Sequence, residues 1–344
     1  MQLYLDSYGA YLSVRGGMFC VRTRTGGERT FAVRQVDALL LTKGTAMSTD
    51  AALLAVQNDL PVLLIDANTH YPLAQLMTAH PGGLATVRKN QAFFAQSSAG
   101  LAWTAAWIAR KIGSQRALLR GLCERQEAAA TFRQQVAEQD KILAVLQKGF
   151  ERWQPPKTWD EAARSATAGQ FRGHEGTASR VYFQLISNYL DGRVEFAGRA
   201  KRPAYDPLNA LLNYLYGMLY THAHLALMKS GLDPQLGILH ADQYNRPTLV
   251  YDFIEAFRTW ADEVALGLVD AGALAEADEF FEPADGEDPD AGLRLAQGGK
   301  GRVVDAMLAF LEARTAYEGK QVKRGVQADM EARRLSTRIR EFQG

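Results

Sequence analysis

The order of hydrophobic and polar residues divides the chain into a strand-rich start and a helical remainder. Short apolar runs of strand length occur at 3–5, 11–14, 18–21, 31–33, 39–41 and 62–65. Gly16-Gly17 separates two of these runs and indicates a hairpin. Ser48 precedes a periodic apolar segment and can cap a short helix that reaches about Leu60. The first part is therefore expected to be mostly β with one helix.

The pattern changes after Pro81-Gly82-Gly83, where residues that favour helices become dominant. Asp206-Pro207 predicts a helix start, because Asp is a good N-cap and Pro fits the first helical position. That helix should run to about Lys229 and end near Gly231. The acidic, glycine-rich stretch 275–301 is expected to be a loop. We therefore predict an α+β protein with a small β-rich, β-sandwich-like domain at 1–83 and a larger all-α domain at 84–344.

Two carboxylates share one predicted helix, which spans about 248–264. Its apolar stripe falls at spacings of four, four and three and consists of Leu249, Phe253, Phe257 and Trp260. Asp252 and Glu255 are three positions apart and therefore neighbours on the helix surface. We expect this pair to face a cleft while the stripe anchors the helix in the core, which would hold the carboxylates firmly.

Two further polar residues stand in unusual local contexts. Glu175 lies between Gly173 and Gly176, in a segment expected at or near a helix start, and small neighbours allow DNA to approach closely. His240 follows the turn-rich segment 231–234 and should lie on a loop or a short helix. Two carboxylates and an imidazole can hold a divalent metal and leave positions for water and phosphate. Spacing alone does not join them, and each residue taken singly fits a structural role.

Composition limits the class of protein. A chain of 344 residues has room for two domains. Its two cysteines, Cys20 and Cys123, make no disulfide framework, which favours a reducing cytoplasm. The start of the chain lacks a signal-peptide pattern, and no apolar run approaches the roughly 18 residues of a membrane span. We therefore expect a cytoplasmic protein that does not bind membranes.

Charge is segregated along the chain, although the net charge is only +1. Residues 88–125 hold seven basic side chains and one acid, whereas 276–290 hold eight acids and no base. Segregated basic residues can form a phosphate-binding face, and solvated helix faces explain the same clusters equally well. The candidate DNA-binding residues are Arg110, Lys111, Arg116, Arg120, Lys201 and Arg202.

Four motifs occur in a fixed order along the chain: Gly173-x-Glu175-Gly176-x-Ala178, Arg202-Pro203-x-x-Asp206-Pro207-x-Asn209, Gly231-Leu232-Asp233-Pro234-x-x-Gly237-x-Leu239-His240 and Arg246-Pro247-x-Leu249-x-x-Asp252-x-x-Glu255. With these motifs the chain resembles the CRISPR-associated adaptation integrases, the metal-dependent subunit that inserts new spacers into CRISPR arrays. The resemblance implies that Glu175, His240 and Glu255 hold the catalytic metal. It makes Asp252 a further acid of the site.

The resemblance also implies an activity and a set of partners. With Mg²⁺ or Mn²⁺, such an enzyme joins the 3′-hydroxyl ends of protospacer DNA to the repeat by transesterification. Homodimers joined through the β-rich domains would flank a small ferredoxin-like second adaptation protein and bind double-stranded protospacer and repeat DNA. Two alternatives are a stand-alone, structure-specific DNA nuclease that uses the same metal site and a DNA-binding assembly scaffold with an inert site.

Overall fold

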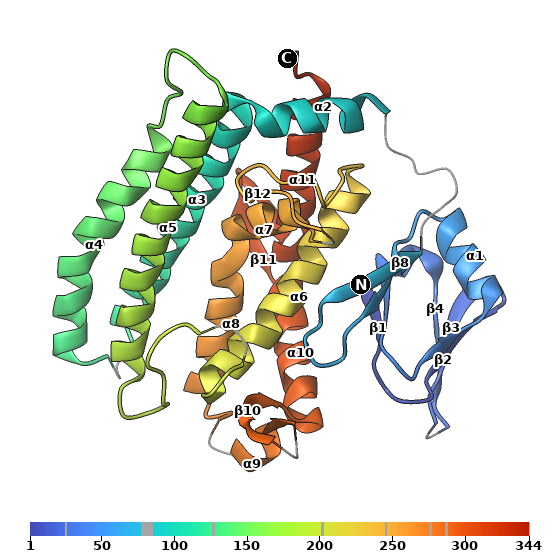
Figure 1. Cartoon of the computed structure of the whole chain (residues 1–344). Coiled ribbons are helices and arrows are strands. Elements are labelled where there is room, and N and C mark those ends of the chain that lie inside the picture. The colour runs from blue at the N-terminus through green and yellow to red at the C-terminus, as the bar shows by residue number, and fades with distance from the viewer. Residues whose placement is uncertain are drawn as a thin grey trace.

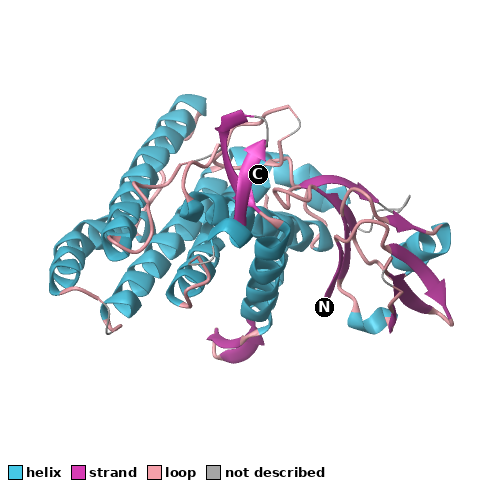
Figure 2. Ribbon diagram, turned by 90° about the horizontal axis from the view of Figure 1, so that it is seen from below, coloured by secondary structure: helices cyan, strands magenta, loops and turns pink. Residues whose placement is uncertain are grey.

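The computed structural model confirms the α+β fold, with strands concentrated before residue 77 and helices dominant from residue 85. It describes residues 1–24, 26–76, 85–125, 128–200, 203–244, 246–274, 277–285 and 288–343, without the side chains of 277, 278, 285 and 288–291. The strand-rich part lies on one side of the molecule and a layer of long helices lies on the other, with more helices between them (Figure 1). The view from below shows the strand-rich part at one side and a few further strands among the helices (Figure 2).

Two mixed four-stranded sheets form the strand-rich part. The first has the order β1 (Gln2–Leu5), β5 (Ala38–Leu41), β7 (Val62–Ile65) and β8 (Pro72–Leu76). The second has the order β4 (Glu28–Phe31), β3 (Met18–Arg22), β2 (Tyr11–Arg15) and β6 (Ala46–Met47). Strand β5 pairs in parallel with β1 and β7, whereas β8 runs antiparallel to β7. The predicted hairpin at Gly16-Gly17 is confirmed by the pairing of β2 with β3.

Helix α1 (Thr49–Gln57) and the two sheets enclose one small core. The Ser48 side chain caps this helix as predicted, because its Oγ accepts a hydrogen bond from the amide of Ala51 at 3.1 Å. Residues from both sheets and from α1 form the core, among them Leu12, Phe19, Leu39 and Ala51. The other face of the first sheet packs Leu40 and Leu63 against Leu225 of helix α6 (Pro207–Lys229). Strand β5 is therefore buried on both faces, which explains its uninterrupted apolar sequence.

The helical part is built from helices of different lengths. Besides α6 these are α2 (Ala85–Gln96), α3 (Ser98–Cys123), α4 (Ala130–Glu151), α5 (Glu161–Leu190), α7 (Thr248–Ile254), α8 (Arg258–Asp270), α10 (Gln297–Glu312) and α11 (Arg324–Arg340). Helices α3, α4 and α5 pack against one another in the layer far from the strands (Figure 1). The predicted α6 is confirmed, and the Asp206 carboxylate caps it by accepting from the amide of Asn209 at 2.8 Å.

The C-terminal part is not entirely helical. The stretch expected as a loop contains α9 (Ala277–Phe280), β9 (Phe281–Asp285) and β10 (Asp288–Leu295), and β11 (Arg314–Tyr317) pairs with β12 (Lys320–Lys323) further on. The prediction of a loop at 275–301 was wrong because it rested only on the acidic residues and glycines of this stretch. Phe281 and Leu295 are buried and lie opposite each other in the β9–β10 pair, where they anchor a hairpin.

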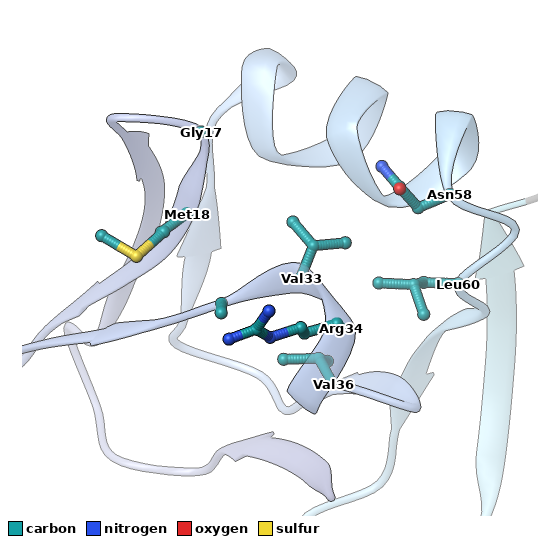
Figure 3. Close-up of a pocket in the computed structure, with 8 residues that line it drawn as sticks. Gly17, Met18, Val33, Arg34, Val36, Asn58 and Leu60 are labelled. Carbon is teal, nitrogen blue, oxygen red and sulfur yellow. The ribbon is translucent and has the colours of Figure 1, made fainter.

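The expected domain boundary at 83/84 falls within 77–84, outside the described residues, so this division stays a prediction. None of the described helices combines the length and apolar character needed to cross a membrane. A pocket of about 470 Å³ in the strand-rich part is lined by Met18, Val33, Arg34, Asn58 and Leu60, among others (Figure 3). It contains none of the candidate site residues, which come from the helical part.

Candidate active site

Three elements of the helical part bring charged side chains together. Helix α3 contributes Lys111, helix α5 contributes Glu175, and Glu255 begins a 3-10 turn between α7 and α8. The predicted single helix over 248–264 is therefore interrupted by a 3-10 helix, Glu255–Phe257. Helix α3 packs against both α5 and this turn.

Glu175 lies in the middle of α5, so its expected place at a helix start was wrong. The helix begins much earlier, after the Asp160 carboxylate, which accepts from the amide of Ala163 at 2.8 Å. The glycines around Glu175 do not end the helix, because apolar side chains fix it against its neighbours and packing outweighs a local propensity cost. On α5, the apolar face of Ala178, Tyr182, Leu185 and Tyr189 is buried.

Lys111 lies between the two predicted glutamate ligands. Its Nζ donates to Glu255 Oε2 at 2.7 Å and also to Glu175 Oε1. The Lys111 side chain is only 5% exposed. The structure therefore places this residue inside an acid cluster, whereas the sequence suggested a DNA contact on a basic surface.

Glu255 is an ionised carboxylate despite its burial. Burial favours the neutral form, but the Arg258 guanidinium and the Lys111 ammonium outweigh it and lower the pKa of Glu255 to about 2. Arg258 Nε donates to Glu255 Oε1 at 2.7 Å, so each oxygen of this carboxylate has a basic partner. Burial disfavours the ammonium of Lys111 as well, yet Glu255 and Glu175 raise the pKa of Lys111 above its ordinary value. Glu255, Lys111 and Arg258 therefore hold full charges near neutral pH.

Asp252 organises the loop that carries His240. Its Oδ2 accepts from the amides of Ile238 and Leu239 at 2.6 and 2.9 Å. Its Oδ1 accepts from the amide of His240 at 3.1 Å and lies 2.6 Å from His240 Nδ1. The Asp252 side chain is fully buried, and His240 lies on a loop, as predicted. The expectation that Asp252 faces a cleft beside Glu255 was therefore wrong, because its lone pairs point at the His240 loop.

The hydrogen bond to Asp252 fixes the tautomer of His240. An ionised carboxylate only accepts hydrogen bonds, so Nδ1 carries the hydrogen and the neutral ring presents the lone pair of Nε2. This hydrogen bond raises the pKa of His240 more than burial lowers it. The His240 side chain is 40% exposed, which leaves its outer edge accessible. Metal-binding histidines are commonly oriented in this way by a carboxylate behind them.

Helix α5 connects the two halves of the site. Arg164 donates to the carbonyl oxygen of Ile238 at 3.0 Å, and Arg172 donates to that of Leu239 at 3.3 Å. The helix that carries Glu175 therefore also holds the His240 loop. Within the described ranges, however, no three His, Cys, Asp or Glu side chains are placed to hold one ion together. The structure joins Glu175 to Glu255 through Lys111 and joins His240 to Asp252.

The chemistry of these donors suits Mg²⁺ or Mn²⁺. Carboxylate oxygens and an imidazole are ligands that both ions accept, and the two glutamates already converge on a cation, the ammonium of Lys111. The residues that would hold the metal are Glu175, Glu255 and His240 through Nε2. Asp252 would act behind His240 and not as a ligand.

All four candidate DNA-binding residues on α3 have acidic partners from other elements. Arg116 forms hydrogen bonds to both oxygens of Asp140 at 2.6 and 2.8 Å, and Arg110 lies 3.2 Å from Glu331. Arg120 lies 3.9 Å from Asp140, and its side chain is 58% exposed. Lys201 and Arg202 lie outside the described residues. DNA binding by these residues stays a prediction.

Sequence reasoning missed the roles of Arg258 and Lys111. Arg258 follows Glu255 by three positions, a spacing that signals an ion pair on a helix and that could have been noticed. Lys111 is far from both glutamates in sequence, and no local pattern indicated the contact. Ser179, one turn after Glu175, donates to Glu175 Oε1 at 2.7 Å and also escaped notice.

Solved structures share this fold. A Cas1 protein from Thermotoga maritima aligns with a TM-score of 0.75 at 19% identity and covers 100% of this chain and 98% of its own. A casposase bound to its integration product aligns with a TM-score of 0.76 at 19% identity, covering 99% and 91%. A chain of a Cas6-RT-Cas1–Cas2 complex aligns with a TM-score of 0.74 at 21% identity, covering 98% of this chain and 35% of that one.

Sequence comparison identifies the family. The family model described as "CRISPR associated protein Cas1" matches residues 3–308. A CRISPR-associated endonuclease Cas1 of Archaeoglobus fulgidus is 28% identical over 335 residues, which cover 94% of this chain and 91% of that protein. The chain belongs to the Cas1 family of CRISPR-associated endonucleases, which confirms the resemblance in its motifs.

Proposed function

We propose that this protein is a metal-dependent DNA integrase of CRISPR spacer acquisition, which joins protospacer 3′-hydroxyl ends to the repeat by transesterification. The observation that carries the proposal is the convergence of Glu175 and Glu255 on one cation. His240, oriented by Asp252, lies on a loop held by the same helix as Glu175. Membership of the Cas1 family and likeness to a casposase bound to an integration product support it.

The side chains divide the work between binding and positioning. When bound, Mg²⁺ or Mn²⁺ polarises the phosphodiester and stabilises negative charge on the leaving oxygen. Glu175 and Glu255 supply anionic oxygens, and Arg258 keeps Glu255 ionised. Asp252 holds the proton on His240 Nδ1, so that Nε2 stays available for the ion.

The substrate itself brings the nucleophile. The 3′-hydroxyl oxygen of the protospacer forms a bond to phosphorus in the repeat backbone, while the bond from that phosphorus to the adjacent 3′ oxygen breaks. The attacking hydroxyl loses its proton, and the departing oxygen gains one, so the number of phosphodiesters is conserved. With water as the nucleophile, the same site would hydrolyse DNA, which is the nuclease alternative.

We infer partners from the same family relationship. The protein would act as a homodimer on double-stranded protospacer and repeat DNA, together with a small ferredoxin-like second adaptation protein. The similar chain in a Cas6-RT-Cas1–Cas2 complex supports a partner of this kind. Among the DNA-contact candidates, the exposed Arg120 is the best placed of those described on α3.

A strand-joining assay tests the proposal. A short duplex with free 3′-hydroxyl ends is offered to a repeat-bearing plasmid, with the second adaptation protein and Mn²⁺ or Mg²⁺ present. His240→Ala and Glu255→Gln should each lower joining at least 100-fold, on the order of the loss of an essential catalytic group. Glu263→Gln, which alters a half-exposed acid paired with Arg324, should join normally. Chelation of the metal should abolish joining.

Three results would count against the proposal. Normal joining by His240→Ala or Glu255→Gln would remove these residues from the reaction. Joining that survives complete metal removal would exclude the metal. Hydrolysed ends without joined strands, with donors that carry a 3′-hydroxyl, would favour the stand-alone nuclease.

A further inference from the structure

The ammonium group of Lys111 lies between the carboxylates of Glu175 and Glu255. Its ammonium is bonded to Glu175 on α5 and to Glu255 on the 3-10 turn, and its side chain is 5% exposed. A lysine on α3 is thus the link between two acids that are distant in sequence. The contact belongs to the protein itself and needs no other molecule.

Three of the four carboxylate oxygens of Glu175 and Glu255 already accept hydrogen bonds from side chains of the protein. Glu255 Oε2 accepts from Lys111, and Glu255 Oε1 accepts from Arg258 at 2.7 Å. Glu175 Oε1 accepts from both Lys111 and Ser179. A divalent ion that bound both glutamates would compete with these internal donors for the two carboxylates.

Electrostatic repulsion makes the Lys111 ammonium and a divalent metal ion alternative cations for the space between the two carboxylates. Two carboxylates in a space of low dielectric repel each other and need a cation between them. One ammonium meets that need in the absence of metal. A divalent ion beside the same ammonium would place like charges together, so the binding of one disfavours the other.

We propose that Lys111 is an internal competitor of the catalytic metal, which holds Glu175 and Glu255 together in the metal-free protein and leaves them when the metal binds. The inference rests on the proposed function, because it takes these glutamates as ligands of a divalent ion. It assigns Lys111 a role in setting metal affinity. The displaced ammonium moves away from Glu255 and becomes accessible to solvent and to DNA phosphates.

Manganese binding to the full-length protein tests this. Mn²⁺ affinity is measured by calorimetry or electron paramagnetic resonance. The measurement is made at pH 8, where few protons compete with the metal ion for its ligands. Lys111→Gln should bind Mn²⁺ at least tenfold more tightly than the wild type. Lys323→Gln, which removes a lysine paired with the surface acid Glu312, should bind like the wild type.

Two outcomes distinguish a failure of the competitor role of Lys111 from a failure of the proposed metal-dependent function. If the wild type binds Mn²⁺ and Lys111→Gln binds it equally or more weakly, the competitor role is wrong while the metal site stands. If neither protein binds Mn²⁺, both the competitor role and the metal-dependent function are wrong.

A second measurement does not depend on a folded variant. Amine labelling of the wild type, read by mass spectrometry, reports the accessibility of each lysine with and without Mn²⁺. Lys111 labelling should rise at least severalfold when Mn²⁺ is bound, while the labelling of Lys323 stays constant. Unchanged labelling of Lys111 at saturating Mn²⁺ would overturn the proposal.

Discussion

At the scale of single residues, Asp252 gives the site its shape. One buried carboxylate accepts three backbone amides and orients the His240 ring, so it determines both the course of the loop and the tautomer of the imidazole. Charge-assisted hydrogen bonds to a buried carboxylate are worth more than neutral ones. The loop therefore depends on the negative charge of Asp252 as well as on its size.

Asp252→Asn tests this dependence. The amide retains one acceptor oxygen and loses the charge, so the pKa of His240 should fall and strand joining should drop by about 10–100-fold, as for other residues that orient a metal ligand. The measurements are an NMR titration of His240 and the joining assay. Asp233→Asn, in the same loop but capping the amide of Gln235, should change neither. An unaltered His240 pKa in Asp252→Asn would contradict the positioning role.

The residue types of the site could be predicted, but their partners could not. Ordered motifs pointed to Glu175, His240, Glu255 and Asp252, because each has a recognisable local context. Lys111 was predicted as a DNA contact because the basic residues of α3 are obvious in sequence. The acids that neutralise them lie on α4, α5, α11 and the 3-10 turn, and only the folded chain brings them close.

At the scale of elements, the boundaries with a capping signal were predicted best. Ser48 and Asp206 cap α1 and α6 as the sequence indicated. The start of α5 and the β9–β10 hairpin were missed, since glycine and charge suggested loops there and long-range packing decided otherwise. A local sequence pattern reflects only local conformational preference, and the free energy of tertiary packing can outweigh that preference.

Gly217 gives a prediction about how α6 meets the strand-rich part. A Cβ at this position would overlap the carbonyl oxygen of Thr69, in the turn between β7 and β8. Gly217→Ala should therefore force that turn away from α6 and lower the free energy of unfolding by about 1–3 kcal/mol. Urea unfolding measures the effect.

The matched control is Gly121→Ala on α3, where a Cβ would meet nothing within 4 Å. Alanine favours helices over glycine, so this variant should be as stable as the wild type or more stable by up to about 1 kcal/mol. Equal stability of the two variants would show that α6 and the turn do not pack closely at Gly217.

At the scale of the whole molecule, His70 links the strand-rich and helical parts. Its ring stacks on Tyr4 with centroids 5.0 Å apart, and its carbonyl oxygen accepts from Thr221 of α6. Burial lowers the pKa of His70 from 6.5 to about 4. The unfolded chain therefore takes up a proton that the folded chain does not. The stabilisation from His70 is complete above pH 6.5 and is lost as the pH falls towards 4.

His70→Asn should reduce this loss. Asn does not titrate, and it tolerates the positive φ of 56° at this position. A shift of about 2.5 pKa units corresponds to roughly 3 kcal/mol, which is the largest difference expected between wild type and variant in the acid-induced loss of stability. Unfolding by urea at pH 7, 5 and 4 measures it. Identical losses for both proteins would contradict the role of His70.

The division into a strand-rich start and a helical remainder was predictable because strand and helix periods differ along the chain. The strand order β1-β5-β7-β8 was not, since it pairs segments that are separated by other strands. The packing of the first sheet on α6 could not be predicted either, because nothing in the sequence around Leu225 indicates which strands it contacts. The homodimer and the second adaptation protein remain proposals.

The position of manganese in crystals of this protein grown with Mn²⁺ would show directly whether the glutamates and His240 share one ion. Anomalous diffraction at the manganese edge locates the ion without reference to activity. We expect a peak bound by Glu175, Glu255 and His240 Nε2, with the Lys111 ammonium displaced. Manganese bound elsewhere, with Lys111 still between the two glutamates, would contradict this expectation.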